Sequence, residues 1–362
     1  MKYIIVNYPG RNGAGPVYSY EMTKGLIENG CKVICILSNS IENRYLWQEL
    51  DVSDIIWLST YGDNLSFCTN TIKFLFNGIK VLDQISREDI EAVYCPMISP
   101  WTSFINQYLG FEKSVVTVHD PTMHFGTNPI IAYFMQRKLK ENHKFILLSE
   151  ALADQFLKKY GIPRSNLAII PHGRFNYYYK ESQISPKGKL KILFLGRICK
   201  YKGLESLAQA MRTVQKHDES LELIIAGSGD FKPYRKWFDA VKNVTLINKW
   251  LSDDEIAAIY RMNNVITVLP YMDASQSGII PIAMEYGSPV ISTDVGGLPE
   301  QLGYGKNGRL VPPGNPAALA DAIIELLDND DMRETIVNNA TKALGLLDWK
   351  VLSRELIEFI KK

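Results

Sequence analysis

The chain has 362 residues, of which 46% are hydrophobic and 22% are charged, a balance typical of globular proteins. This length accommodates two domains, each with its own core. The formal net charge of +1 lacks the basic excess of a nucleic-acid-binding protein, so we expect no nucleic-acid partner.

Cysteine usage and the lengths of the apolar runs predict a cytoplasmic location. The cysteines are odd in number, form no C-x-x-C motif and stand at Cys31, Cys35, Cys68, Cys95 and Cys199. We interpret them as reduced thiols. No apolar run has the length of a membrane span, and the N-terminal segment lacks the features of a signal peptide. Any membrane contact is therefore expected to be peripheral, at the inner face.

Strands and helices alternate through the first half of the chain. Short apolar runs predict strands over residues 3–6, 33–37, 55–58, 93–95, 115–118, 145–148 and 167–170. Helices are expected over residues 17–28, 130–141 and 150–160. Ser149 is placed to cap the last of these helices. The segment 176–189 has no apolar periodicity and carries Pro, Gly and Ser, so we expect a linker there.

A second series of alternating elements follows this linker. Strands are expected over residues 192–195, 221–226, 244–247 and 265–269, with another beginning at 290. Helices are expected over residues 204–214, 279–286, 316–327, 332–344 and 349–360, with one more ending near 262. Ser252 and Glu255 fit a capping box ahead of the helix that ends near 262.

The two series predict an α/β protein with two Rossmann-like, doubly wound domains facing a central cleft. Ligands of open parallel sheets bind at the carboxyl ends of the strands. The loops that follow strands are therefore the candidate functional segments.

Two glycine-rich loops follow strands but do not fit the dinucleotide-binding fingerprint. Its third glycine is replaced by Tyr18 after the first loop and by Lys232 after the second, which disfavours a nicotinamide-dependent dehydrogenase. The simplest interpretation of Gly13-Ala14-Gly15 is a tight turn. The alternative is that Gly15 lets the backbone approach a ligand closely.

Three histidines are weighed as site residues. His119 closes a strand and is followed by Asp120, which is placed either to orient the imidazole or to cap a turn. A lone histidine is more often structural, but the position of His119 at a carboxyl end makes both interpretations equally good. His124 and His172 are weaker candidates.

Arg197 and Lys202 lie between a strand and the following helix. Two solvated surface cations would be the ordinary interpretation. Their position at a carboxyl end instead favours stabilisation of a diphosphate leaving group.

The loop before the helix at 279–286 combines an acid, two hydrogen-bonding side chains and a glycine. These are Asp273, Gln276, Ser277 and Gly278. Backbone N–H groups at a helix start favour anions, whereas a carboxylate would bind sugar hydroxyls. We interpret the loop as a site that holds the diphosphate of an activated sugar.

The order and spacing of several stretches resemble glycosyltransferase family 4, whose members are retaining enzymes of the GT-B fold. The matching stretches are N-G-A-G-P-V, T-V-H-D-P, I-I-P-H-G, L-G-R-I-C-K-Y-K-G-L, I-I-A-G-S-G, W-L-S-D-D-E-I and P-V-I-S-T-D-V-G-G-L-P-E. The resemblance implies domains over 1–178 and 190–348, with the terminal helix 349–362 packing back on the first. It also implies a nucleotide-sugar donor, retained anomeric configuration and no metal or other cofactor.

The resemblance also implies roles for individual residues. Arg197 and Lys202 would clamp the donor diphosphate, and His119 would lie beside the transferred sugar. The remaining donor contacts would come from Gly15, Asp273, Gln276 and the backbone of Ser277, Gly278 and Ile279.

One departure concerns the two glutamates that family members carry seven residues apart. The aligned positions are Ala274 and Ile282 here, and Glu285 lies one helical turn beyond the second. The A-S-Q-S-G sequence resembles a variant branch of the family, so the donor base and sugar stay open.

The expected function is hexosyl transfer to a glycan or lipid-linked acceptor in polysaccharide or glycolipid biosynthesis. The alternatives are a nucleotide-sugar-binding protein without catalysis and a sugar-nucleotide epimerase on the same fold. Two segments, 67–85 and 133–144, mix aromatic and basic residues. They are ordinary amphipathic helices or a surface for anionic lipid, and the first interpretation is the better supported.

Overall fold

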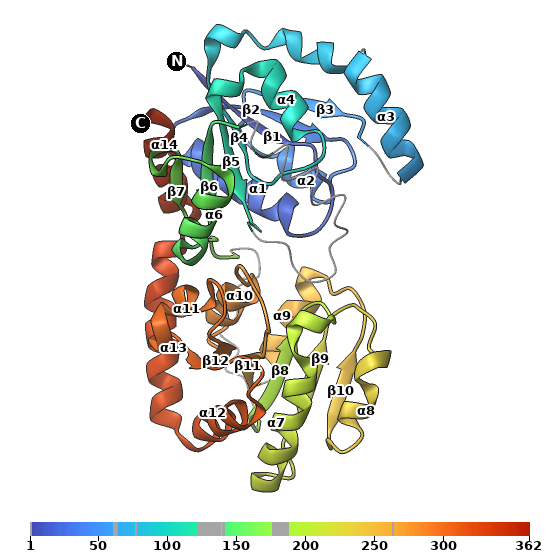
Figure 1. Cartoon of the computed structure of the whole chain (residues 1–362), viewed down its shortest axis with the longest axis vertical. Helices are drawn as coiled ribbons and strands as arrows, with labels where there is room; N and C mark the ends of the chain where they lie inside the picture. The colour runs from blue at the N-terminus through green and yellow to red at the C-terminus, as the bar shows by residue number, and fades with distance from the viewer. Residues whose placement is uncertain are drawn as a thin grey trace. The chain divides into compact units, whose positions relative to one another are not determined.

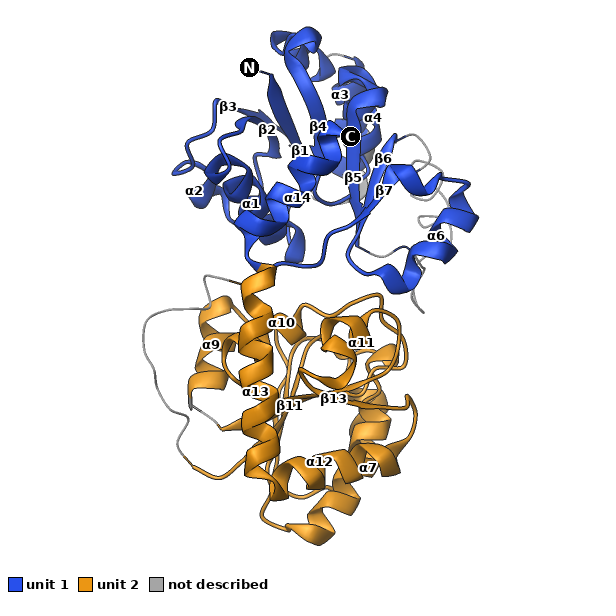
Figure 2. Cartoon of the chain, turned by 90° about the vertical axis from the view of Figure 1, so that its left-hand side faces the viewer, with its two compact units in different colours: residues 1–123, 127–173, 348–362 blue, residues 124–126, 174–347 orange. Residues whose placement is uncertain are grey.

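The computed structural model describes residues 2–60, 64–76, 78–119, 121, 139, 142–175, 188–262 and 264–362. These form two compact units, coloured separately in Figure 2. Unit 1 contains the described residues up to Gly173 together with Asp348–Lys362, and unit 2 contains those from Arg174 to Leu347. Residues 176–187 of the expected linker 176–189 lie outside the described residues. Of the expected helix 130–141, only residue 139 is described.

The described part of unit 1 contains a parallel seven-stranded sheet in the order β3-β2-β1-β4-β5-β6-β7 (Figure 1). Its strands are β1 (Tyr3–Tyr8), β2 (Lys32–Ser38), β3 (Asp54–Leu58), β4 (Ile90–Cys95), β5 (Ser114–Val118), β6 (Lys144–Leu147) and β7 (Leu167–Ile169). Its α-helices are α1 (Ala14–Glu28), α2 (Arg44–Trp47), α3 (Asn64–Phe76), α4 (Thr102–Leu109), α6 (Ala153–Tyr160) and α14 (Trp349–Lys361). Side chains of α1 and α14 form one core cluster with the sheet, and side chains of α3 and α4 form another.

The terminal helix α14 is part of unit 1 although it is far in sequence from the rest of that unit. It packs along α1, where Gly25 allows the two backbones to approach closely. The Asn29 amide donates to Lys350 O at 2.8 Å and to Ser353 Oγ at 2.9 Å. At the other end of α14, Lys144 Nζ donates to the carbonyls of Phe359 and Ile360, each at 3.1 Å. A lysine at this end also complements the helix dipole.

Unit 2 contains a parallel six-stranded sheet in the order β10-β9-β8-β11-β12-β13 within its described residues. The strands are β8 (Lys191–Leu195), β9 (Leu223–Ala226), β10 (Val244–Ile247), β11 (Val265–Leu269), β12 (Val290–Thr293) and β13 (Arg309–Val311). The α-helices are α7 (Leu204–His217), α8 (Arg235–Phe238), α9 (Asp253–Met262), α10 (Ile279–Glu285), α11 (Leu298–Gln301), α12 (Pro316–Asp328) and α13 (Asp330–Leu344). Short 3₁₀ segments include Glu150–Leu152 before α6 and Lys200–Lys202 before α7.

The α/β architecture with two Rossmann-like units is confirmed. The capping box before α9 is also confirmed, since Ser252 N donates to Glu255 Oε2 at 3.0 Å and Glu255 N to Ser252 Oγ at 3.3 Å. Ser149 accepts from Ala151 N at 3.2 Å, but the turn it caps is a 3₁₀ turn. Sequence reasoning missed the eight-residue helix α4 and the shorter elements α2, α8, α11 and β13. The shorter ones contain too few residues to show a clear periodicity.

Within the described residues, no helix is both long enough and apolar enough to cross a bilayer. The described cysteine side chains at positions 31, 35, 95 and 199 are free thiols.

We predict that Gly25→Ala destabilises the protein. An added Cβ would lie 2.5 Å from Trp349 O and 2.6 Å from Ser353 Oγ, so α14 must shift. We expect the free energy of unfolding to fall by about 1–3 kcal/mol, measured by urea denaturation. Gly345→Ala is the matched control, because Gly345 has helical dihedral angles and no atom within 4 Å of the added methyl group. Equal stability of the two variants would contradict the close packing of α14.

Candidate functional site

His119 lies directly after β5 and is held at the carboxyl edge of the first sheet. Its Nε2 lies 2.9 Å from the carbonyl oxygen of Pro96, which follows the neighbouring strand β4. Because a carbonyl only accepts, Nε2 must be the protonated nitrogen. The ring is partly exposed. Asp120 and His124, the other candidates in this loop, lie outside the described residues.

Tyr18 of α1 connects His119 to the rest of the unit 1 core. Its buried ring meets His119 edge-on with centroids 4.6 Å apart, and it meets His172 at 5.4 Å. Trp349, the first residue of α14, also contacts Tyr18, and the centroids of these two rings are 5.2 Å apart. Edge-to-face pairs of this kind fix ring orientation. The terminal helix thus buttresses His119 through Tyr18.

The Tyr18 hydroxyl is buried, and none of the described residues forms a hydrogen bond of good geometry with it. Burial raises the pKa of Tyr18 to about 12, while the nearby hydroxyls of Tyr94 and Thr117 oppose that rise. Those two hydroxyls lie 3.0 Å apart and bond to each other. Tyr18 is therefore a neutral packing residue at physiological pH.

His172 follows β7 and is buried as an uncharged ring. Its Nδ1 donates to the carbonyl of Gly173 at 2.8 Å. Burial lowers the pKa of His172 to about 4, the Gly173 carbonyl opposes this shift, and nearby His119 adds to it. His172 therefore supports the cluster in its neutral form.

Gly15 is explained by packing within unit 1. A Cβ at this position would lie 2.1 Å from the Tyr8 hydroxyl and 2.9 Å from Met97 Sδ. The space beside Gly15 is thus occupied by these two side chains. A role in approaching a ligand stays a prediction.

Arg197 and Lys202 lie at the carboxyl end of β8 in unit 2. Arg197 is exposed, and no described residue forms an ion pair with its guanidinium. The ammonium of Lys202 lies 3.4 Å from the centroid of the buried Tyr271 ring and 5.0 Å from that of Tyr201. Cation–π contact holds an ammonium in place without neutralising its charge.

Close backbone contacts bring the strand ends of unit 2 together. A Cβ at Gly203 would lie 1.8 Å from Pro270 O, and the Met272 amide donates to Tyr201 O at 2.7 Å. At Gly227, a Cβ would lie 2.0 Å from the carbonyl oxygen of Gly196. The glycines after β9 therefore serve backbone packing, which agrees with the missing dinucleotide fingerprint.

The loop at 273–279 is held by a side chain that sequence reasoning missed. Gln301 of α11 accepts from Ser277 N through Oε1 at 2.8 Å and donates to Ser277 O through Nε2 at 3.1 Å. Ser277 Oγ accepts from Ile279 N at 3.3 Å. The amides of Ser277 and Ile279 are therefore used inside the loop. The backbone amides of Ser277, Gly278 and Ile279 were the predicted donors. Of these three, only the Gly278 amide has no hydrogen-bond acceptor among the described residues.

The other polar side chains of this loop are only partly exposed. Asp273 and Gln276 are both half-buried. Gln276 Oε1 and Ser275 Oγ are buried, and none of the described residues hydrogen-bonds to either atom. Both are polar atoms shielded from solvent in this structure.

The positions of the two missing glutamates are apolar in the structure. Ala274 and Ile282 are buried, at 3% and 4% exposure. Glu285 does not replace them, because its side chain is 1% exposed and its Oε1 is paired with Arg174 at 2.5 Å. Ribose recognition through a glutamate of α10 is therefore not supported.

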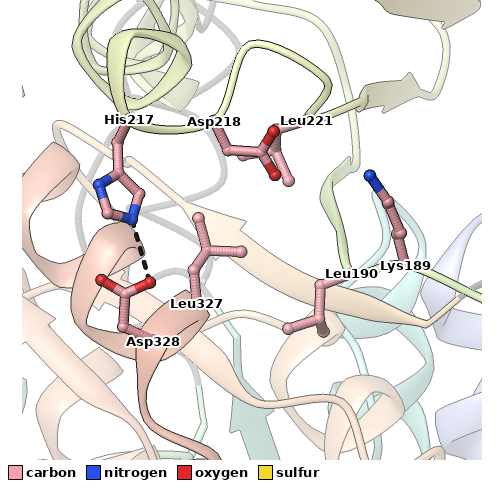
Figure 3. A pocket seen from close by; sticks show the side chains of 7 residues that line it. All are labelled: Lys189, Leu190, His217, Asp218, Leu221, Leu327 and Asp328. Carbon is pink, nitrogen blue, oxygen red and sulfur yellow. Dashed lines mark hydrogen bonds and ion pairs between the residues drawn. The ribbon is translucent and has the colours of Figure 1, made fainter.

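Among the described residues of unit 2, neither a metal-ligand cluster nor the hollow beside β8 and β9 offers an alternative centre. Among the described side chains, no three His, Cys, Asp or Glu residues are grouped as metal ligands. A hollow of about 300 Å³ lies beside Leu190 and Leu221, which precede β8 and β9 (Figure 3). It is at the amino ends of the strands, and His217 and Asp328 form a 3.0 Å pair across its wall.

Tyr271 and Gln301 are the residues that sequence reasoning did not single out. Tyr271 directly follows the proline after β11, so its place at a carboxyl end was a usable signal. Gln301 is 24 positions from Ser277, and nothing in the local pattern distinguishes it.

We predict that acidification destabilises unit 1 through His172. The unfolded chain binds a proton on this residue near pH 6.5, whereas the folded chain does so near pH 4. Stability is therefore lost as the pH falls through this window, by about 3 kcal/mol in total for a shift of this size. Urea titrations at several pH values should show a shallower pH dependence for His172→Phe. An unchanged slope in this variant would contradict the assignment.

Comparisons with known proteins bear on the family of this chain. The family model described as Glycosyltransferase Family 4 matches residues 15–174, and that described as Glycosyl transferases group 1 matches residues 178–343. An uncharacterized glycosyltransferase of Methanocaldococcus jannaschii is 27% identical over 240 residues, which are 61% of this chain and 60% of that protein.

Two further relatives bear on fold and family. The phosphatidyl-myo-inositol mannosyltransferase of Mycobacterium leprae is 32% identical over 169 residues, 46% of this chain and 45% of that enzyme. The chain thus spans 60% of the length of the M. jannaschii protein and 45% of that of the M. leprae enzyme. Anabaena HepE, solved with UDP, superposes over 100% of both chains with a TM-score of 0.74 and 15% identity, which supports the fold. With two family models matching consecutive halves, the chain belongs to glycosyltransferase family 4 and has the GT-B fold.

Proposed function

We propose that this protein is a retaining, metal-independent glycosyltransferase that uses a nucleotide-sugar donor. The observation that carries the proposal is the pair Arg197 and Lys202, an exposed guanidinium and a ring-held ammonium at the end of β8. Breaking the bond between sugar and diphosphate leaves negative charge on the diphosphate. Two cations fixed near the diphosphate would stabilise this negative charge in the transition state.

The neighbouring loop supplies complementary chemistry for a sugar. β11, which precedes this loop, is the direct neighbour of β8 in the sheet. In this proposal the carboxylate of the half-buried Asp273 accepts hydrogen bonds from sugar hydroxyls, and Gln276 Oε1 is a further acceptor. The Gly278 amide is a donor suited to a phosphate oxygen. Unit 2 thus contains groups for both parts of a nucleoside diphosphate sugar.

His119 is the proposed contributor of unit 1, beside the transferred sugar. The bond to Pro96 O places a proton on Nε2 and fixes the ring at the carboxyl edge of the sheet. We propose that the ring contacts the transferred sugar from this position. Retention of anomeric configuration and transfer to a glycan or lipid-linked acceptor are parts of this proposal, set in polysaccharide or glycolipid assembly.

A nucleotide panel tests the proposal directly. We would measure binding of UDP, GDP, ADP and dTDP by calorimetry, then incubate the protein with sugar derivatives of the base that binds. HepE has been solved with UDP, so UDP is the first probe. Release of free nucleotide with transferred or hydrolysed sugar supports a transferase. An isomerised donor would identify an epimerase, and binding without turnover a sensor.

We predict that Lys202→Ala and Arg197→Ala each lower kcat/KM for the donor by about 10- to 100-fold. Each removes a charge-assisted hydrogen bond to the leaving diphosphate. Lys200→Ala is the matched control, because Lys200 is an exposed lysine of the same 3₁₀ turn. Unchanged turnover in both site variants would refute the clamp.

Unit 1 carries an exposed apolar surface that we propose as a peripheral membrane contact. On α3 and the 3₁₀ segment Gly78–Gln84, the exposed apolar side chains are Ile72, Leu75, Phe76 and Val81. Lys73 and Lys80 are exposed among them. Apolar anchors with adjacent lysines fit a bilayer of anionic lipid. The second segment, 133–144, lies mostly outside the described residues.

We predict that the protein sediments with phosphatidylglycerol vesicles more than with phosphatidylcholine vesicles. Phe76→Ser should lower the partition constant about tenfold, because Phe76 is 75% exposed and its ring would be lost from the lipid contact. Trp250→Ser is the control, since Trp250 is 66% exposed on unit 2. An equal effect of both substitutions would argue against this surface.

A further inference from the structure

Two residues without an assigned role, Tyr271 and Gln301, contact the groups of unit 2 that we propose to bind the donor. Gln301 holds the backbone of Ser277, with both amide atoms engaged at 2.8 and 3.1 Å. Ser277 Oγ lies 3.4 Å from the hydroxyl of Tyr271. The Tyr271 ring in turn supports the ammonium of Lys202.

Tyr271 itself is fixed from several sides. It is fully buried at 0% exposure, and its carbonyl accepts from Thr293 Oγ1 at 2.6 Å. The next residue, Met272, donates its amide to Tyr201 O, which joins this segment to the turn that carries Lys202. The ring is therefore a rigid platform.

The choice of an aromatic platform has an electrostatic consequence. A carboxylate beside Lys202 would hold the side chain but neutralise its charge toward a phosphate. A neutral ring attracts the ammonium without bringing an opposing charge of its own.

Gln301 acts on the other half of the loop. A primary amide that pairs with both backbone groups of Ser277 fixes the peptide planes on either side of that residue. The Gly278 amide follows directly, and Gly278 also packs against the Phe175 ring, which would lie 3.5 Å from an added Cβ. The orientation of the Gly278 N–H thus depends on Gln301.

We propose that Tyr271 and Gln301 are positioning residues for donor recognition. Tyr271 holds Lys202 for the diphosphate, and Gln301 holds the 276–279 loop for the sugar. This inference rests on the proposed function, because it assumes that the donor is a nucleoside diphosphate sugar.

The first test compares diphosphate with monophosphate binding. Calorimetry with UDP, GDP, ADP and dTDP and with their monophosphates yields an affinity ratio for each variant. Tyr271→Leu should lower this ratio about tenfold, as we also expect for Lys202→Ala, because the ammonium loses its support. The double variant should be no worse than Lys202→Ala alone, since both changes remove one interaction. Tyr271→Phe keeps the ring and should keep the ratio.

The second test separates Gln301 from a general effect on stability. Gln301→Met should raise KM for the sugar nucleotide about tenfold, while the diphosphate-to-monophosphate ratio stays at the wild-type value. Gln209→Met is the matched control, because Gln209 is a half-buried glutamine of α7 in the same unit. Its KM should stay at the wild-type value.

A direct measurement covers the case in which Tyr271→Leu does not fold. Reductive methylation with ¹³C-formaldehyde labels the lysines of the wild-type protein, and Lys202→Ala assigns the Lys202 resonance. Its methyl signal should be shifted upfield by the ring current of Tyr271. An unshifted signal, additive effects in the double variant or a wild-type ratio in Tyr271→Leu would overturn the proposal for Tyr271. For Gln301, a wild-type KM in Gln301→Met would do so.

These outcomes are distinct from failure of the proposed function. If the wild-type protein bound none of the diphosphates, both the function and this inference would fall. If the wild-type protein bound a diphosphate and turned over the corresponding sugar nucleotide, the proposed function would stand. The measurements on Tyr271→Leu and Gln301→Met would then decide the roles of these two residues.

Discussion

The parallel direction of the strands is the constraint on which the rest of this structure depends. In both sheets, each described strand pairs with its neighbours in parallel, so the carboxyl ends of each sheet share one edge. This brings Pro96 after β4 beside His119 after β5. It also brings the turn after β8 beside the loop after β11, where backbone contact leaves no room for a side chain at Gly203. The pairing of the strands alone therefore brings residues that are distant in sequence close together at this edge.

The carboxyl edge of unit 2 combines positive charge with satisfied loop amides. The neutral Tyr271 ring that contacts the Lys202 ammonium brings no opposing charge to it. The two loop amides that Gln301 and Ser277 engage are not left unpaired, which avoids the cost of buried polar groups. The two positions that the family resemblance aligns with glutamates are the buried Ala274 and Ile282, so they supply no carboxylate to the site. This difference favours an anionic ligand held mainly by cations and backbone.

Unit 1 depends on a helix contributed by the opposite end of the chain. Gly25 of α1 lets α14 approach, and Gly173 leaves room for the Trp349 ring, which would lie 2.4 Å from an added Cβ. Trp349 contacts Tyr18, and Tyr18 contacts His119. The orientation of the candidate histidine is therefore coupled to the packing of the terminal helix. His172 contributes to the same cluster as an uncharged ring.

The sequence by itself determined the two α/β series, nearly all long elements and the family. Apolar runs, capping residues and strand-end motifs are local signals, and they located Arg197, Lys202 and His119 at carboxyl ends. Only the tertiary structure decided which groups hold these side chains. Gln301 and Ser277 are 24 positions apart, and Lys202 and Tyr271 are 69 apart, so no local periodicity relates them. The engaged amides of Ser277 and Ile279, the Glu285–Arg174 pair and the packing reason for Gly15 were likewise invisible in one dimension. They arise from contacts between separate strand-end loops and helices, and such contacts exist only after the sheets have formed.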